Sequence, residues 1–313
     1  MNKLNTIKGR INIGKFSEVS AFRFKTILKM VLIPMSTLIV LIFFLYILIE
    51  MNLAYFKAFN VIDIGEMESA YYDYLFSALV DMGKYTFGFL VFMAVIGMYI
   101  SNLLLRPFKI IAEYCECRVA NKKAEYNPDF FSDLKLLTSI SDFFFYTVDN
   151  VLLVTNKSVG KVPSKFTKIH KPVFERAFFL QFFFIFLIVS LLLSAILYVS
   201  VNNIYENLVT LSLQLVVKEK VFLKFFNLQK EIFSVVLNVG IICNFIFFIS
   251  LAFNLYDKVS SPAFGIFSTM RSFIKGNYGS RIHLVGYYYM RDYCRSINKY
   301  FAFIQKSINE NKS

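Results

Sequence analysis

The chain has 313 residues, of which 57% are hydrophobic, and it contains 38 Phe and no Trp. This hydrophobic share exceeds the roughly 45–50% that is usual for soluble domains, so the composition excludes an ordinary soluble protein. A net charge of +13 is compatible with nucleic-acid binding, because basic chains neutralise phosphates. The distribution of that charge along the chain decides between nucleic acid and a membrane surface.

Four apolar runs cover residues 30–51, 85–105, 177–201 and 232–256. Each reaches the ~20 residues that a helix needs to cross the ~30 Å hydrocarbon layer of a bilayer. Lipid offers no hydrogen-bond partners, so the backbone of a spanning segment must satisfy its own donors and acceptors as a helix. The sequence therefore predicts an all-α membrane protein with four transmembrane helices.

Basic residues are concentrated in every second segment between these runs. Residues 1–29, 106–176 and 257–313 hold 7, 12 and 9 Lys or Arg, whereas residues 51–84 and 202–231 hold 2 and 4. An excess of positive charge marks the cytoplasmic side of a membrane protein. We therefore expect both termini in the cytoplasm, the lipid bilayer as the surrounding partner and no nucleic-acid partner.

The pattern of run, external segment, run and cytoplasmic segment occurs over residues 22–150 and again over 174–308. Pro107 follows the second run just as Pro262 follows the fourth. Each unit crosses the membrane twice, so both units would have the same orientation around an axis along the membrane normal. We predict two parallel repeats, each followed by a cytoplasmic helix pair.

The predicted organisation has six parts. They are a basic cytoplasmic N-terminus (1–29), a transmembrane hairpin (30–105) with an external segment (52–84), a first cytoplasmic unit (106–150), a basic linker (151–176), a second hairpin (177–256) with an external segment (202–231), and a second cytoplasmic unit with a tail (257–313). Chains below about 40 residues rarely fold alone, so each external segment is expected to be a short helical extension or hairpin. A sensory pocket made by both external segments together is the alternative.

The second cytoplasmic unit carries residues at regular spacings. Pro262 precedes Gly276 by fourteen residues, the pair Arg281-Ile282 follows, and Ile297-Asn298 lies in a second helical stretch. Proline suits the first turn of a helix, and glycine suits a helix end that requires a positive φ. Two narrow apolar faces result, with Ile266, Met270, Phe273 and Ile274 on the first and Met290, Tyr293, Ile297, Tyr300 and Ile304 on the second.

This unit resembles a HAMP domain, the signal-relay module beneath many bacterial receptors and sensor kinases. Pro262, Gly276-Asn277, Arg281-Ile282 and Asn298 stand at the family's positions. The family's Asp-Glu-hydrophobic-Gly signature is replaced by Tyr288-Tyr289-Met290-Arg291. The resemblance implies a relay role for these residues, a parallel four-helix coiled coil and a bacterial inner membrane.

The first unit, residues 106–148, is similar to the same family, with Pro107 in place and Asn121 where glycine is expected. HAMP modules act as homodimers, so two units in one chain imply a bundle that closes within the monomer as a pseudo-dimer. A homo-oligomer is the alternative. The residues expected to be buried in this bundle are Phe108, Ile111, Val119, Ile140 and Phe144 from the first unit and Ile266, Met270, Phe273, Ile297 and Tyr300 from the second.

The sequence contains no set of residues typical of catalysis or metal binding. Cys115-Glu116-Cys117 could be a fragment of a metal site, but the only histidines are His170 and His283 and no second cysteine pair has ligand spacing. Neither a nucleotide-binding glycine loop nor a nucleophile–base pair is present. We therefore expect no enzyme activity, no cofactor and no metal, and we interpret the two cysteines as small side chains on a helix.

The favoured function is a non-enzymatic signalling adaptor or a subunit of a membrane complex. Shifts of packed helices can switch such a bundle between two arrangements, and a protein partner at the cytoplasmic bundle would receive the signal. A channel or transporter and a purely structural membrane subunit are the alternatives. Buried charge marks ion pathways, and Glu50 at the edge of the first run is the only ionisable carboxylate or base in the runs. Amides and hydroxyls in the runs, among them Ser190, Ser194 and Asn244, are expected to form interhelical hydrogen bonds.

Overall fold

A computed structural model of the protein describes residues 18–59, 64–122, 126, 134–149, 162–214 and 219–310. The fold is all-α, as predicted, and the described residues contain no strand. The elements are α1 (Glu18–Ala58), α2 (Ile64–Val119), α3 (Lys135–Thr147), α5 (Ser164–Thr167), α6 (Arg176–Gln214), α7 (Glu219–Ile274), the 3-10 helix η2 (Tyr288–Met290) and α8 (Arg291–Glu310).

Four helices, α1, α2, α6 and α7, are long and apolar enough to cross a membrane. They contain 41, 56, 39 and 56 residues. At 1.5 Å per residue, helices of these lengths cover ~60–80 Å, about twice the ~30 Å hydrocarbon layer or more. The chain is a multi-pass membrane protein whose helices continue beyond the bilayer.

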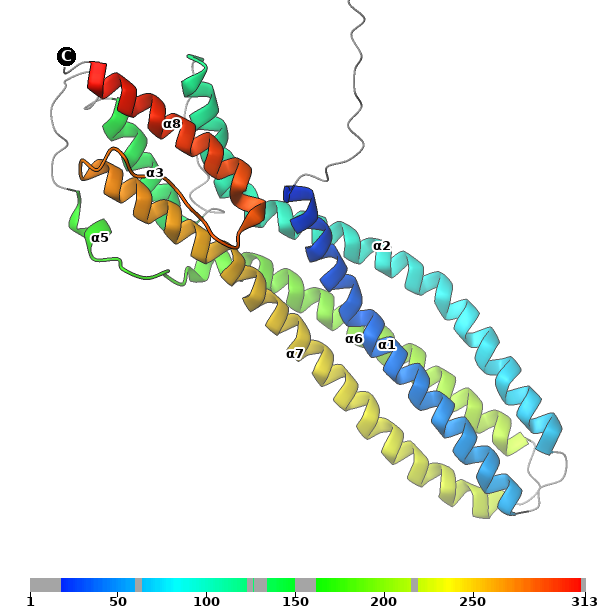
Figure 1. The fold of residues 1–313 in the computed structure, drawn as a ribbon. Coiled ribbons are helices and arrows are strands. Elements are labelled where there is room, and N and C mark those ends of the chain that lie inside the picture. Colours follow the sequence, from blue (N-terminus) through cyan, green and yellow to red (C-terminus); the bar gives the residue numbers. More distant parts are fainter. Residues whose placement is uncertain are drawn as a thin grey trace, which may run out of the picture.

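The long helices pack side by side along most of their length (Figure 1). α1 packs against α2 and α7, and α6 packs against α7. At one tip of the molecule α1 and α6 end and α2 and α7 begin, and we call this tip the loop end. The opposite tip, which we call the bundle end, carries α3, α5, η2, α8 and the last turns of α2 and α7.

Buried apolar side chains form two separate cores. The loop-end core includes Phe56 of α1, Tyr71 of α2 and Phe226 of α7. The second core extends from the spans into the bundle end and includes Phe144 of α3 and Phe273 of α7. All four long helices contribute buried residues to each core. α2 and α7 also continue past Pro107 and Pro262 into the bundle end, so these two helices connect the two ends of the molecule.

The prediction that Pro107 and Pro262 lie in the first turn of a new helix is wrong. Pro107 lies inside α2, and Pro262 lies inside α7. A proline in a helix interior removes one hydrogen bond and costs about 3 kcal/mol or more. Tertiary packing holds both helices continuous, because buried residues such as Leu104, Phe108 and Val259 flank the prolines. Each of these helices therefore runs unbroken from the membrane into the bundle end.

The other helix ends also lie beyond the expected boundaries. α1 begins at Glu18, inside the segment assigned to a basic N-terminus, and not near residue 30. The described parts of segments 52–84 and 202–231 continue the four long helices, which confirms the helical extensions expected there. Hydropathy marks only the lipid-facing part of a helix, whereas packing at the loop-end core extends each helix further.

The described part of the basic linker, residues 162–175, packs onto the bundle end. Phe166 of α5 is buried, and the Arg271 guanidinium of α7 donates to the carbonyls of Phe166 and Ile169 at 2.9 and 2.6 Å. Residues 151–161 lie outside the described residues. The segment predicted as a simple connection is therefore, from residue 162 on, part of the packed structure.

Candidate functional site

The bundle end contains a four-helix bundle built from both halves of the chain. Its members are α3, α8 and the parts of α2 and α7 that follow Pro107 and Pro262 (Figure 1). α2 packs against α8, and α3 packs against α7. Each early helix therefore pairs with a late one within a single chain.

Nine of the ten residues that the sequence predicted to be buried in this bundle lie in its interior. Val119 is 37% exposed, because it is the last residue of α2 and lies where the helix leaves the bundle. The other nine residues are at most 1% exposed, namely Phe108, Ile111, Ile140, Phe144, Ile266, Met270, Phe273, Ile297 and Tyr300. The bundle thus covers its own apolar faces.

Aromatic rings fill the centre of the bundle. The Phe144 ring lies 5.7 Å from that of Phe273 and 5.3 Å from that of Phe301, measured between centroids. The Phe273 and Phe301 rings lie 4.9 Å apart. Such pairs stabilise by roughly 0.5–1.5 kcal/mol beyond the burial of their area. One ring from each of α3, α7 and α8 therefore meets at this point.

A partly buried carboxylate, Asp149, forms a polar cluster that sequence reasoning missed. It accepts hydrogen bonds from Arg118 at 2.5 Å, Tyr114 at 2.7 Å and Tyr300 at 3.5 Å. Burial, and then the Asp149 charge, raise the pKa of the Tyr300 hydroxyl, so this tyrosine stays a neutral donor. The cluster connects the end of α2 to α8. The only signal in the sequence is that Tyr114 and Arg118, four residues apart, lie on one face of a helix.

The two helices that contain Pro107 and Pro262, α2 and α7, end in the same way. Asn121 has a φ of 54° and Gly276 a φ of 100°, and Asn121 is the only non-glycine residue with positive φ in the described chain. The N–H of each donates to the carbonyl three residues earlier, at 3.1 Å for Asn121 and 3.0 Å for Gly276. The next N–H donates five residues back, at 3.0 Å for Lys122 and 3.2 Å for Asn277. These bonds satisfy carbonyls that a helix end otherwise leaves unpaired.

The connector between α7 and α8 is held by the amide of Asn298. Its Oδ1 accepts from the backbone N–H of Ile282 at 2.8 Å, and its Nδ2 donates to the Ile282 carbonyl at 3.0 Å. Arg281 donates to Gln305 of α8 at 2.6 Å. The structure therefore brings together three residues that the sequence singled out, Arg281, Ile282 and Asn298.

Tyr289, in the segment that departs from the HAMP signature, takes over a missing helix bond. Pro262 has no N–H, so the carbonyl of Lys258, four residues earlier, loses its normal helical donor. The Tyr289 hydroxyl donates to that carbonyl at 2.7 Å. The first turns of α1 cover the same segment, since Phe22 stacks on Tyr289 at 4.5 Å and Arg291 pairs with Glu18 at 2.5 Å.

Glu175, just before α6, caps the N-terminus of α3. Its carboxylate accepts the backbone N–H of Lys135 at 2.5 Å and of Leu136 at 3.1 Å. Burial raises the pKa of the Glu175 carboxyl, while the two N–H groups act in the opposite direction. The start of α6 is thereby joined to α3 at the bundle end.

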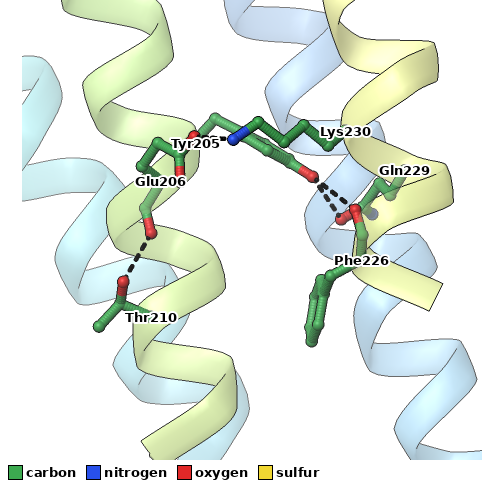
Figure 2. Close-up of polar contacts among 6 residues, drawn as sticks. All are labelled: Tyr205, Glu206, Thr210, Phe226, Gln229 and Lys230. Carbon is green, nitrogen blue, oxygen red and sulfur yellow. Dashed lines mark hydrogen bonds and ion pairs between the residues drawn. The ribbon is translucent and has the colours of Figure 1, made fainter. Parts of the chain in front are cut away.

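The loop end has a buried polar network of its own. The Gln229 amide of α7 donates to Asn52 of α1 at 2.7 Å. Figure 2 shows the Tyr205 hydroxyl of α6 donating to the Phe226 carbonyl at 3.3 Å and to Gln229 at 3.5 Å. Segments 52–84 and 202–231 therefore meet at the loop end, and side chains of both contribute to the loop-end core.

Three buried polar groups in the spans contradict the expected interhelical hydrogen bonds. Ser190 and Ser194 of α6 and Asn244 of α7 have no hydrogen-bond partner within the described structure. Other polar residues bond within their own helix, for example Thr37 to the Ile33 carbonyl at 3.2 Å. Helix packing in these spans therefore relies on apolar contacts more than the polar content of the sequence suggests.

The described residues contain no group of three or more His, Cys, Asp or Glu side chains that could hold a metal ion. Cys115 is buried and Cys117 is partly exposed, and both thiols are free. No protein-family model, curated protein or solved structure matches the chain.

Proposed function

We propose that the chain is a non-enzymatic signalling adaptor, or a subunit of a membrane complex, that relays changes in helix packing across the membrane. The observation that carries this proposal is the continuity of α2 and α7, which contribute buried residues to both cores. Close-packed cores have discrete arrangements and do not deform continuously. A rotation or shift of either helix at the loop end then repacks the bundle.

We propose further that the two cytoplasmic helix pairs are HAMP-like units of a duplicated chain. Pro107 precedes Asn121, and Pro262 precedes Gly276, by fourteen residues each. The matching hydrogen bonds at Asn121 and Gly276 support a common origin of the two units. The contact between Asn298 and Ile282 supports the assignment of the connector in the second unit.

We propose that the bundle end lies on the cytoplasmic side of a bacterial inner membrane. A protein partner would bind the outer surface of the bundle. The excess of Lys and Arg in segments 106–176 and 257–313 over segments 51–84 and 202–231 supports this orientation.

The relay is tested by changing one end and measuring the other. In a chain without native cysteines, Glu116→Cys and Ser296→Cys are joined by a short bifunctional thiol reagent, because these two side chains meet at 2.5 Å between α2 and α8. Gln229→Met then removes the buried hydrogen bonds at the loop end while keeping the volume. Lys230→Met on the next residue is the control, because it removes only an exposed ion pair with Glu206.

We expect Gln229→Met to change the rate of bridging severalfold and Lys230→Met to leave the rate unchanged. An equal rate in all three proteins, with the loop end shown to be destabilised by Gln229→Met, would contradict the relay. That result would favour a purely structural subunit.

A channel is the second candidate, because Asn244 is fully buried and neither the N nor the O of its amide has a hydrogen-bond partner among the described residues. A polar group left unpaired inside a span is costly, and such groups are often kept for a function. If the chain is a relay, we expect no ion flux across vesicles that contain the reconstituted protein. A reproducible current that Asn244→Leu abolishes would establish the channel instead.

A further inference from the structure

A groove of about 450 Å³ lies where the linker meets the start of α6. Three cationic side chains from three elements line it, namely Lys135 of α3, Lys165 of α5 and Arg176 of α6. All three residues are exposed. The groove therefore brings together positive charges from the first helix pair, the linker and the second membrane hairpin.

The positive charge of this groove is only partly offset by the protein, because the Glu175 charge interacts with that of Lys135. Glu175 is the only acidic residue in its lining, and its carboxylate already accepts the N–H groups of Lys135 and Leu136. Within the described part of the chain, Lys135, Lys165 and Arg176 form no salt bridge. Lys165 Nζ lies 4.7 Å from the centroid of the Phe166 ring, a contact that supplies no negative charge. Three cations and one carboxylate leave the groove with a net positive charge for a bound anion.

Apart from Ser139, the remaining wall of the groove is apolar and reaches the start of the third apolar run. Phe166, Ile169 and Ala177 line it, and Ala177 begins the third apolar run. Leu180 and Phe184 follow Arg176 at intervals of four residues and are 41% and 54% exposed. Residues four apart lie on one face of a helix, so an apolar strip continues from Arg176 along α6.

We propose that this groove binds the headgroup of an anionic phospholipid, with Lys135, Lys165 and Arg176 on the phosphate and the acyl chains along the apolar strip of α6. Free phosphate shares the charge chemistry but would leave the apolar wall unused. Basic pockets beside membrane helices on the cytoplasmic side suit anionic headgroups. The assignment to the cytoplasmic leaflet rests on the proposed function.

A headgroup held by three elements would fasten α5 and α3 to the start of α6. Ligands that bind only one arrangement of a structure stabilise that arrangement. The lipid would therefore favour the docked position of the linker that the structure shows.

The test is native mass spectrometry of the detergent-solubilised full chain with added phosphatidylglycerol or phosphatidylcholine. The triple variant Lys135→Gln, Lys165→Gln, Arg176→Gln is compared with the control Lys258→Gln, Lys275→Gln, Lys299→Gln, which loses equal charge at exposed positions outside the groove. All substituted side chains are exposed, so both variants should fold, and their melting temperatures check this.

We expect the wild type and the control to retain phosphatidylglycerol in preference to phosphatidylcholine, and the groove variant to bind it at least about tenfold more weakly. Equal retention by the groove variant, or displacement of the lipid by millimolar inorganic phosphate, would overturn the proposal. Lipid binding is measured without the introduced cysteines, and the bridging experiment keeps the groove intact. Failure of one proposal is therefore distinguishable from failure of the other.

Discussion

At the scale of single residues, the carbonyl of Lys258 illustrates how the connector and α7 depend on each other. Pro262 deprives this carbonyl of its helical donor, and the Tyr289 hydroxyl donates to it at 2.7 Å. A buried carbonyl without a donor costs roughly 1–3 kcal/mol. Tyr289 therefore stabilises the helix at the point where the proline weakens it.

A double-mutant cycle tests this compensation. Tyr289→Phe should destabilise the protein by roughly 1–2 kcal/mol in the wild-type background. In a Pro262→Ala background the same change should cost less, because the introduced alanine supplies a backbone N–H to the Lys258 carbonyl. The four melting temperatures in detergent give the coupling between the sites. An equal cost of Tyr289→Phe in both backgrounds would show that the hydroxyl does not replace the helical bond.

A second residue-scale prediction concerns the thiol of Cys294 in α8. Burial raises its pKa from 9.0 to about 11. The folded state thus holds the thiol proton more tightly than the unfolded chain. This difference favours folding fully below about pH 9, and the contribution is lost as the pH rises to about 11. At pH 8 its thiolate fraction is lowered roughly 100-fold, so alkylation should be slow and should accelerate up to about pH 11. Rapid labelling at pH 8 of a variant that keeps Cys294 as its only cysteine would contradict this.

Sequence reasoning at this scale found residues with strong backbone requirements and missed residues that act through tertiary contacts. Gly276 and Asn298 were identified because their spacing matches a known connector. The Asp149 cluster was not, since its partners Tyr114 and Tyr300 are far apart in the sequence. The prediction that Ser190 and Asn244 form interhelical hydrogen bonds was wrong. A polar side chain on a helix does not show which residue of a neighbouring helix lies opposite it.

At the scale of elements, Asn121 and Gly276 have positive φ at the ends of α2 and α7. Introducing a glycine at such a position should raise stability, and removing one should lower it. Glycine adopts positive φ without strain, so Asn121→Gly should stabilise the end of α2 by up to about 1 kcal/mol. Gly276→Ala should destabilise the end of α7 by about 1 kcal/mol, although nothing lies within 4 Å of the added Cβ. Thermal unfolding of both variants checks the signs. A destabilising Asn121→Gly would show that the Asn121 side chain makes contacts that outweigh its backbone strain.

The existence of the four long helices could be predicted at this scale, whereas their ends could not. Hydropathy detects the lipid-facing stretch of each helix and falls where amphipathic packing takes over. Pro107 and Pro262 were therefore placed at helix starts, although buried neighbours carry α2 and α7 through them. The linker was predicted to be a plain connection, because a single buried side chain, Phe166, leaves little periodic signal.

At the scale of the whole molecule, the bundle combines α2 with α8 and α3 with α7, so neither half of the chain can close it alone. The sequence predicted this closure from two apolar stripes that one unit cannot bury. A homodimer that exchanges these helices between chains would bury the same side chains. Only an experiment that identifies which chains are joined separates the two arrangements.

The most direct measurement is therefore the identity of the product formed when Glu116→Cys and Ser296→Cys are bridged in membranes. Two differently tagged copies of the cysteine-substituted chain are co-expressed, bridged with the short thiol reagent and analysed by denaturing gel and mass spectrometry. We predict a bridge within each chain, with the product at monomer mass and no co-purification of the second tag. Bridges that form only between the differently tagged chains would contradict the account of a relay closed within one chain.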